Sequence, residues 1–297
     1  MIYKLGQHII AQGDSTDPAF VERITKGISI RSVVADPPYG VAYVENKDWV
    51  GLRGPSMEQS ARGRKKIVGD QLQTDEEYTK FTESWIKALV PHLAPKNSFY
   101  IFNSDVMACA LRAGMKAADV YCSQFIIWVK NSMVLGRKDY NPQHELIAYG
   151  WHGSHRFERS TAKSVLFCPK PAKAKLHPTM KPVELLRKLV ANSTKAGEWV
   201  CDPFLGSGST LIACEHLKRR CLGIEMDEEY VKTAVARWEK LTGQKAILAD
   251  KGEKQATTMS HVKRLNAGQG VDTSRAGRIK RPEESTRIVS KLNYGGA

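Results

Sequence analysis

Long apolar runs, paired cysteines and clustered metal ligands are all missing from this chain of 297 residues. No apolar stretch approaches the roughly 20 residues that cross a bilayer, and the amino terminus lacks the basic-then-apolar pattern of a secretion signal. We therefore expect a cytoplasmic protein with no membrane partner. The six cysteines form no Cys-x-x-Cys pair and no close Cys/His cluster, so we expect neither a metal site nor a disulfide framework.

Acidic residues are the minority charge, with 31 Asp and Glu against 45 Lys and Arg, which gives a net charge of +14. Such an excess favours a polyanionic partner. Nucleic acid is the leading candidate, because Lys and Arg contacts to phosphate supply most non-specific affinity. The alternative is a soluble protein that is merely basic. The length fits one large α/β domain or two smaller ones.

Short apolar runs alternate with amphipathic stretches over the first 250 residues. The stretch at 75–93, for example, repeats Tyr78, Trp85 and Leu89 along one helical stripe. This alternation predicts a mostly parallel sheet with helices on both faces. We predict strands at 7–12, 32–35, 98–102, 125–129, 145–149, 198–201 and 221–224, and helices starting at 18, 75, 106, 182, 209 and 228.

Two segments interrupt or follow this pattern. Residues 41–70 are polar and Gly-rich without a sustained period, which predicts a long basic loop. Residues 251–297 carry ten Lys and Arg against four Asp and Glu, a net of +6, and we predict a flexible basic tail. Residues 1–250 would then form the folded domain. The basic residues that we single out in the loop are Arg62, Arg64, Lys65 and Lys66.

The tetrapeptide Asp36-Pro37-Pro38-Tyr39 follows a predicted buried strand. It places a carboxylate, a rigid backbone carbonyl and an aromatic face at one strand end. The two prolines fix φ twice and remove two N–H donors, so the nearby carbonyls are free to accept from another group. These groups can hold a planar base that carries an amine; an ordinary turn is the alternative.

A second motif, residues 202–210, lies between a predicted strand and a predicted helix. Gly206 and Gly208 let the backbone approach a ligand, and the helix amino terminus offers unpaired N–H groups. Glu225 ends the next strand, 225 − 206 = 19 residues after Gly206, where an acidic residue accepts from ribose hydroxyls. Leu211 stands where a dinucleotide motif needs its third glycine, so a nucleoside without pyrophosphate fits better.

In this order the motifs resemble the permuted, or beta-group, amino-methylating DNA methyltransferases, in which the catalytic tetrapeptide precedes the cofactor loop. The resemblance implies a Rossmann-like fold with a seven-stranded, mostly parallel sheet, S-adenosylmethionine as cofactor and the exocyclic amine of a base as acceptor. In that family an Asp at the first tetrapeptide position goes mainly with N6 of adenine, and a Ser mainly with N4 of cytosine. The matching segments are 13–15, 36–40, 128–130, 144–145, 177–182, 202–209 and 223–227.

The resemblance also assigns roles to residues. Asp36 and the carbonyl of Pro37 or Pro38 would accept from the amine, and Tyr39 would stack on a base flipped out of the duplex. The cofactor would contact Asp14, Asp202, Phe204, Gly206, Ser207, Gly208, Glu225, Thr179 and Lys181. Because Lys and Arg bind phosphate, we also expect DNA to contact seven basic residues: Arg62, Arg64, Lys65, Lys66, Lys130, Arg137 and Lys138.

The expected function is therefore site-specific methylation of adenine N6 in double-stranded DNA, of the restriction-modification kind. Alternatives are a cytosine-N4 or RNA amino-methyltransferase, or a nucleic-acid-binding protein that keeps the fold without activity. Residues 151–176 are a short candidate target-recognition region, where family members usually carry a larger one. Either the enzyme is loosely specific, or recognition is divided among several elements or between the subunits of a homodimer.

Overall fold

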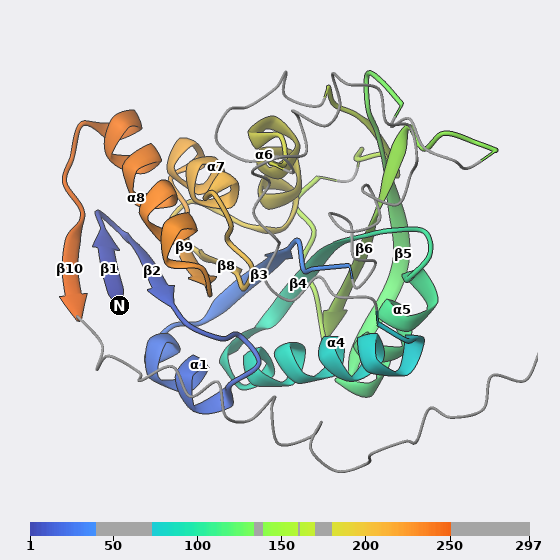
Figure 1. The fold of residues 1–297 in the computed structure, drawn as a ribbon, viewed down its shortest axis with the longest axis horizontal. Helices are drawn as coiled ribbons and strands as arrows, with labels where there is room; N and C mark the ends of the chain where they lie inside the picture. The colour runs from blue at the N-terminus through green and yellow to red at the C-terminus, as the bar shows by residue number, and fades with distance from the viewer. Residues whose placement is uncertain (40–72, 134–138, 160, 170–179, 251–297) are drawn as a thin grey trace, which may run out of the picture. The chain divides into compact units, whose positions relative to one another are not determined.

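The computed structural model describes residues 1–39, 73–133, 139–159, 161–169 and 180–250, all of which belong to one unit, Met1–Gly252 (Figure 1). The predicted basic loop at 41–70 and the predicted tail at 251–297 lie outside the described residues. Within the described part of the chain, no helix is long and apolar enough to cross a membrane.

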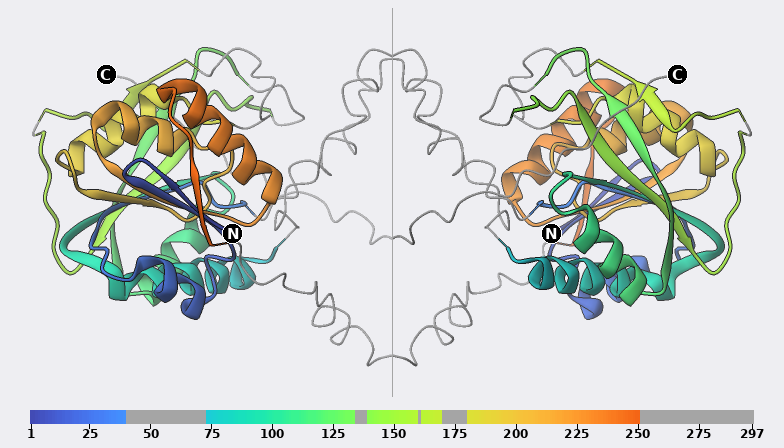
Figure 2. Two further views of the ribbon diagram at one scale, coloured as in Figure 1. Left: turned by 90° about the vertical axis from the view of Figure 1, so that its left-hand side faces the viewer. Right: turned by 90° about the vertical axis from the view of Figure 1, so that its right-hand side faces the viewer.

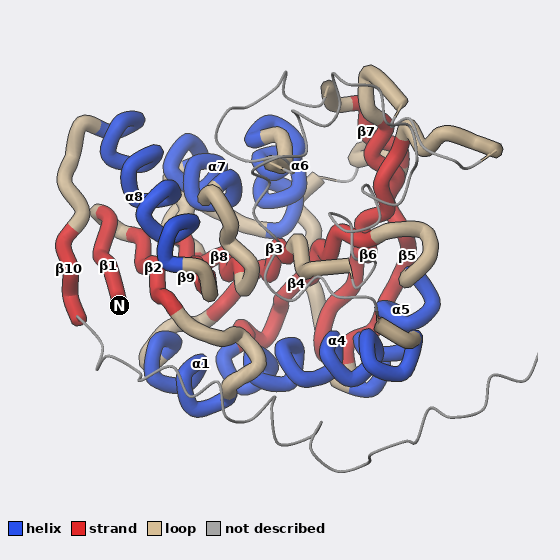
Figure 3. Tube along the Cα trace, in the orientation of Figure 1, coloured by secondary structure: helices blue, strands red, loops and turns tan. Residues whose placement is uncertain are grey.

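A mixed sheet of ten strands forms the centre of the fold, in the order β10-β1-β2-β9-β8-β3-β4-β6-β5-β7 (Figure 3). The strands are β1 (Ile2–Leu5), β2 (His8–Gln12), β3 (Ile30–Ala35), β4 (Leu93–Asn103), β5 (Val120–Val129), β6 (His144–His152), β7 (Val165–Phe167), β8 (Trp199–Asp202), β9 (Arg220–Glu225) and β10 (Ile247–Asp250).

The predicted sheet of seven strands is therefore too small. Seven neighbouring strands, from β2 to β5 in the spatial order, do form a mostly parallel sheet in which β6 alone runs antiparallel. On one side of them, β1 and β10 add an antiparallel pair, and on the other side β7 adds a short parallel strand. These three strands are only three or four residues long, and β7 and β10 are largely exposed, so they lack the sustained apolar pattern that predicts a strand.

Helices cover both faces of this sheet (Figures 1 and 2). One face carries α1 (Pro18–Thr25), α4 (Asp75–Leu89) and α5 (Ala108–Ala117), and the other carries α6 (Val183–Ser193), α7 (Ser209–Leu217) and α8 (Glu228–Thr242). Each layer buries its own core, one around Trp85 and the other around Trp238. The helices on both faces thus shield the parallel strands from water, as parallel sheets require.

Local signals set the ends of the longest helices. Thr74 and Glu77 form a capping box at the start of α4, each side chain accepting from the backbone N–H of the other residue. The predicted helix at 75–93 ends earlier, at Leu89, because Pro91 cannot continue an α-helical hydrogen-bond ladder. A short 3₁₀ turn, η1 (Val90–His92), follows instead.

The carboxyl ends of the parallel strands meet at one edge of the sheet, which is where open α/β sheets bind ligands. Asp36 follows β3, Asp202 ends β8 and Glu225 ends β9. Because β6 runs in the opposite direction, its first residues, His144 and Glu145, come to the same edge. Residues that are far apart in sequence are thereby gathered around one cleft.

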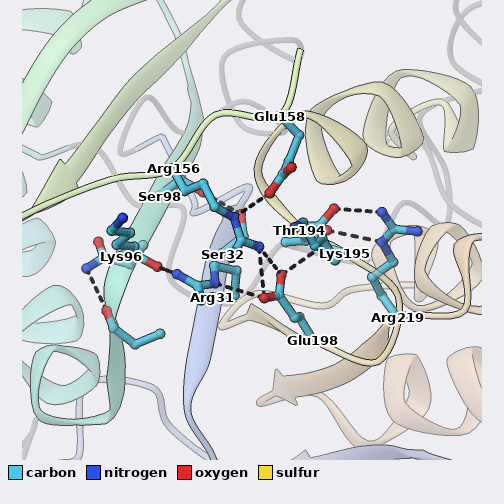
Figure 4. A network of polar contacts seen from close by, with 12 residues as sticks. Arg31, Ser32, Lys96, Ser98, Arg156, Glu158, Thr194, Lys195, Glu198 and Arg219 are labelled. Atoms are coloured by element: carbon cyan, nitrogen blue, oxygen red, sulfur yellow. Dashed lines mark hydrogen bonds and ion pairs between the residues drawn. The ribbon is translucent and has the colours of Figure 1, made fainter.

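The opposite edge is held by a polar network around Glu198 (Figure 4). The Glu198 carboxylate accepts from Arg156 Nη2 at 2.7 and 2.8 Å, from Arg31 Nε at 3.3 Å and from the Lys195 backbone N–H at 2.7 Å. Arg156 belongs to the proposed recognition region at 151–176. The first part of that region is therefore fixed far from the cleft, and the chain returns to the cleft edge at β7, where Phe167 pairs with Val129.

Candidate active site

The Asp36 side chain already has two partners in this structure. The Tyr39 hydroxyl donates to Asp36 Oδ1 at 2.8 Å, and Lys181 Nζ donates to the same carboxylate at 2.7 Å. Lys181 also reaches the Tyr39 hydroxyl at 3.1 Å. Burial raises the pKa of Tyr39 well above its usual value, and the carboxylates of Asp36 and Glu145 raise it further. Tyr39 is therefore a neutral donor at physiological pH.

Glu145 connects this corner to a second lysine. Its carboxylate lies 3.3 Å from Lys181 Nζ and 2.8 Å from Lys130 Nζ. Burial alone would raise the pKa of Glu145, but the two ammonium groups outweigh it and lower that pKa. Burial likewise acts to lower the pKa of Lys181, whereas Asp36 and Glu145 together raise it. Glu145 and Lys181 are thus both charged near neutral pH.

The structure gives each of the two predicted lysines a carboxylate partner. Lys130 was expected to contact DNA and Lys181 to contact the cofactor. Their side chains are 5% and 9% exposed, respectively, and both ammonium groups bind carboxylates. In this conformation the Lys130 ammonium is therefore not accessible to a DNA phosphate. Lys181 does line the same cleft as Asp202, beside the proposed cofactor residues.

The glycine loop after β8 is held by two carboxylates. Gly206 N–H donates to Glu225 Oε2 at 2.7 Å, Asp227 N–H donates to Glu225 Oε1 at 2.8 Å, and Phe204 N–H donates to Asp202 Oδ1 at 3.0 Å. Gly206 and Gly208 have φ of +52° and +84°, which favour glycine. A Cβ at Gly208 would also lie 2.8 Å from the Cβ of Ala234 on α8, so the loop could not take this path with a side chain there.

The remaining predicted cofactor residues flank this loop. Ser207 is fixed by Arg237, whose guanidinium donates to the Ser207 hydroxyl at 3.1 Å and to its carbonyl. The Phe204 ring packs against Phe81 and Trp85 of α4, with centroids 5.8 and 5.5 Å apart.

Asp14 lies directly after β2, where the preceding Gly13 donates its N–H to the Glu225 carbonyl at 3.0 Å. Its Oδ1 accepts from the Thr16 N–H and hydroxyl, both at 2.8 Å. Asp14 therefore stands beside Glu225 at the same sheet edge. Seven of the predicted residues lie outside the described part of the chain: Thr179, Arg137 and Lys138, together with the loop residues Arg62, Arg64, Lys65 and Lys66.

A single cleft joins the Asp36 corner to the glycine loop. The Ser209 hydroxyl, at the start of α7, also lines it and is buried without a hydrogen-bond partner among the described residues. The cleft therefore offers carboxylates, an unpaired hydroxyl and a helix amino terminus, which suit a ligand with an ammonium group, hydroxyls and a carboxylate. Its lining includes Val34, Ala35, Asp36, Phe102, Met180, Lys181, Leu186, Asp202, Phe204, Leu205, Gly206, Ser207, Ser209 and Thr210.

Asp202 carries an unusual charge state in this cleft. Burial is the main cause that raises its pKa to about 7, the negative charges of Asp36 and Glu225 add to the rise, and hydrogen bonds from Thr210 and Phe204 partly oppose it. Near pH 7 the side chain is thus divided between its neutral and charged forms. A cation that binds beside it would draw off the proton.

This raised pKa predicts a pH dependence of stability. Between pH 3.8 and about 7 the folded Asp202 holds a proton that the unfolded chain has lost, so its contribution to stability is present below that window and is lost as the pH rises through it. The free energy of unfolding should therefore fall as the pH rises through this window. We expect Asp202→Asn, which keeps an oxygen for the Phe204 N–H, to reduce that fall by about a few kcal/mol. Urea unfolding from pH 5 to 8 measures it. An identical pH slope in the variant and the parent would contradict the assignment.

Comparisons with known proteins agree with this architecture. The model of a DNA methylase family, the N6/N4 methyltransferases, matches residues 30–236. The chain is 27% identical over 234 residues to the Type II methyltransferase M2.DpnII of Streptococcus pneumoniae, covering 71% of this chain and 83% of the relative. It is 24% identical over 236 residues to the Type II methyltransferase M.HpaI of Haemophilus parainfluenzae, covering 70% and 68%.

Solved structures show the same fold. The M1.HpyAVI–SAM complex superimposes with a TM-score of 0.55 at 23% identity, covering 77% of this chain and 98% of that one. The cytosine-N4-specific PvuII DNA methyltransferase gives 0.59 at 18% identity, covering 81% and 92%. The fold is that of an α/β methyltransferase. The chain belongs to the DNA methylase family of N6/N4 methyltransferases, as the order of its motifs predicts, and is a DNA-methylating enzyme.

Proposed function

We propose that the protein transfers a methyl group from S-adenosylmethionine to N6 of an adenine flipped out of double-stranded DNA. The observation that carries this proposal is the single cleft that joins the Asp36 corner to the loop at Gly206. The choice of adenine rests on the resemblance, in which Asp heads the tetrapeptide of adenine-N6 enzymes. The fold itself does not distinguish adenine N6 from cytosine N4.

The corner residues activate the amine by accepting its hydrogens. An exocyclic amine is a poor nucleophile because its lone pair is delocalised into the ring. Hydrogen bonds from its two N–H groups to Asp36 and to the carbonyl of Pro37 or Pro38 would draw the nitrogen towards tetrahedral geometry and localise that pair. S-adenosylmethionine, when bound, supplies an electrophilic methyl group. Positioning and electrostatics thus provide most of the catalysis, and the amine proton leaves to solvent afterwards.

Tyr39 has to move for this to happen. Its hydroxyl donates to Asp36 Oδ1, one of the oxygens that the amine needs. We infer that the incoming base replaces the hydroxyl as donor and that the Tyr39 ring then stacks on the base. The unpairing of the target base costs roughly a few kcal/mol, which this stacking and the new hydrogen bonds offset.

The proposed cofactor contacts are at the cleft and along the neighbouring sheet edge. Asp202 would take the α-ammonium group, Glu225 the ribose hydroxyls, and the unpartnered Ser209 hydroxyl a polar atom of the methionine part. Asp14 would lie near the adenine ring, and Thr179 and Lys181 near the carboxylate. The support for this placement is the charge of each group and its position at the carboxyl edge of the strands.

We propose that the basic segments bind the phosphate backbone of the DNA. Three segments supply positive charge that can bind phosphate: the loop at 41–70, the segment at Arg137 and Lys138, and the tail at 251–297. Each is close in sequence to elements of the folded unit. We propose that they fix the duplex while a small recognition region, shared among elements or between two subunits, selects the site.

Product analysis tests the proposed function. The protein is incubated with S-adenosylmethionine and matched duplex DNA, single-stranded DNA and RNA oligonucleotides, and the modified nucleoside is identified by mass spectrometry. We expect N6-methyladenine from duplex DNA. N4-methylcytosine or a methylated ribonucleoside would establish one of the alternatives, and no product with any substrate would favour a silent nucleic-acid-binding protein. Mapping of methylated positions in a host genome then gives the sequence context.

A further inference from the structure

Four charged side chains form one row that ends at the amine-binding corner. In order they are Lys130, Glu145, Lys181 and Asp36, so the sign alternates at every step. The contacts along the row measure 2.8 Å from Lys130 to Glu145, 3.3 Å from Glu145 to Lys181 and 2.7 Å from Lys181 to Asp36. Each interior member therefore touches two groups of opposite charge.

Sheet pairing brings the first two members together. Trp128 on β5 lies opposite Glu145 on β6, and Lys130 is two residues further along, which makes it a diagonal neighbour of Glu145 on the same face. Lys130 is fixed there by backbone and side-chain hydrogen bonds with Gln143, at 2.8 and 3.0 Å. Lys181 arrives separately, from the segment before α6. Asp36 follows β3, so the row brings together side chains from four separate segments of the chain.

The row has a consequence for the proposed chemistry at Asp36. An Asp36 carboxylate that accepts from the target amine must stay negative and keep lone pairs for it. Lys181 competes for the same oxygens, at 2.7 Å, and its positive charge opposes both the sulfonium of the donor and the charge that develops on the amine. Without a second anion, Lys181 would neutralise Asp36 just where negative charge is needed.

Glu145 is that second anion. We propose that Glu145, fixed by Lys130, is a positioning residue that shares the Lys181 ammonium with Asp36 and so keeps the Asp36 carboxylate available to the target amine. This role rests on the proposed function of Asp36. Neither Glu145 nor Lys130 is proposed to touch the substrate. Lys130 acts through Glu145, and Glu145 acts through Lys181, although it also accepts from the Tyr39 hydroxyl at 3.4 Å.

Buried ion pairs contribute little to stability when complete, and they cost stability when one member is removed. A test must therefore separate positioning from folding. Glu145→Gln keeps the size and one acceptor oxygen of the side chain but removes its charge, so the Lys181 charge falls on Asp36 alone and Lys130 is left without an anion. We expect kcat to fall about 10- to 100-fold, as for other partners one contact removed from the reacting groups, while the Kd for S-adenosylmethionine changes little.

Two further variants give the rescue test. Glu145→Asp restores the negative charge and should recover part of kcat. Glu145→Gln combined with Lys130→Met removes the buried Lys130–Glu145 pair as a whole, so it should recover stability relative to Glu145→Gln. It should not recover kcat, because Asp36 remains the only carboxylate of the row that binds Lys181. A merely structural role predicts instead that kcat recovers together with stability. Thermal unfolding of each variant shows how much of the protein is folded at the assay temperature.

Glu198→Gln is the matched control. Glu198 is also a partly buried glutamate bound by two basic residues, Arg31 and Arg156, but it lies at the opposite sheet edge (Figure 4). This variant should lose stability and keep its kcat. Wild-type kcat in Glu145→Gln, or equal loss in Glu145→Asp and Glu145→Gln, would overturn the role of Glu145. Activity that survives Asp36→Asn would instead overturn the proposed function itself.

Discussion

Replacement of Asp36 with Asn is expected to reduce methyl transfer by about 100- to 1000-fold, the loss seen when one preorganised transition-state partner is removed. The Asn amide has one acceptor oxygen and no charge. Its NH₂ group is a donor, so it cannot accept a hydrogen bond from the target amine. Binding of S-adenosylmethionine should change little, because Asp202 and Glu225 stay in place. Single-turnover assays with labelled cofactor measure the first quantity, and calorimetric titration measures the second.

The fold should survive this change. Lys181 loses one carboxylate but keeps Glu145 at 3.3 Å, so its ammonium is not left unpaired. Asp119→Asn is the control: this side chain is exposed at the amino end of β5, and its φ of +58° suits Asn as well as Asp. That variant should keep full activity. Near-wild-type turnover in Asp36→Asn would remove Asp36 from the catalytic role.

The elements around the site were predictable because their signals are local. The strand before Asp36, the glycine loop before α7 and the capped helix α8 each carry an apolar period or a turn residue that identifies them. The order of these elements also predicts the parallel edge where Asp36, Asp202 and Glu225 meet. Chain order and strand direction together were enough to place the cleft.

The partners inside the site were not predictable in the same way. Lys130, Glu145 and Lys181 are brought together by antiparallel pairing and by a crossover, and no local pattern encodes either contact. A lysine after an apolar strand has the same sequence signature whether it binds a phosphate or a buried glutamate. One signal was available: if β5 and β6 had been paired as a hairpin, Lys130 and Glu145 would have been expected as diagonal neighbours.

The strands at the borders of the sheet could not be predicted from local sequence patterns either. β10 pairs with β1 although all of its residues are exposed, so its sequence has no alternation to detect. β7 has only three residues and follows a segment that reads as a loop. Both strands form because a neighbouring strand presents unpaired backbone groups, which is a property of the assembled sheet. The count of seven strands therefore described the centre of the sheet and missed its borders.

Glu225→Gln is expected to weaken S-adenosylmethionine binding by about 10- to 100-fold, because it disturbs the glycine loop and removes the proposed contact to the ribose. Both carboxylate oxygens accept from the backbone, one from Gly206 N–H at 2.7 Å and the other from Asp227 N–H at 2.8 Å. A Gln side chain has a single oxygen for these two donors, so its NH₂ group must face one of them. An unmade buried hydrogen bond costs about 1–3 kcal/mol, which corresponds to the expected change in Kd.

The loss should appear in binding rather than in turnover, because Glu225 does not contact the Asp36 corner. At saturating S-adenosylmethionine, kcat of Glu225→Gln should approach that of the parent. For Asp36→Asn, by contrast, kcat should stay low even when the cofactor is saturating. Glu228→Gln is the matched control, since Glu228 begins α8 three residues later and pairs only at the surface with Lys232. An unchanged Kd in Glu225→Gln would mean that the cofactor ribose binds elsewhere in the cleft, and a low kcat at saturation would mean that the glycine loop also positions the reacting methyl group.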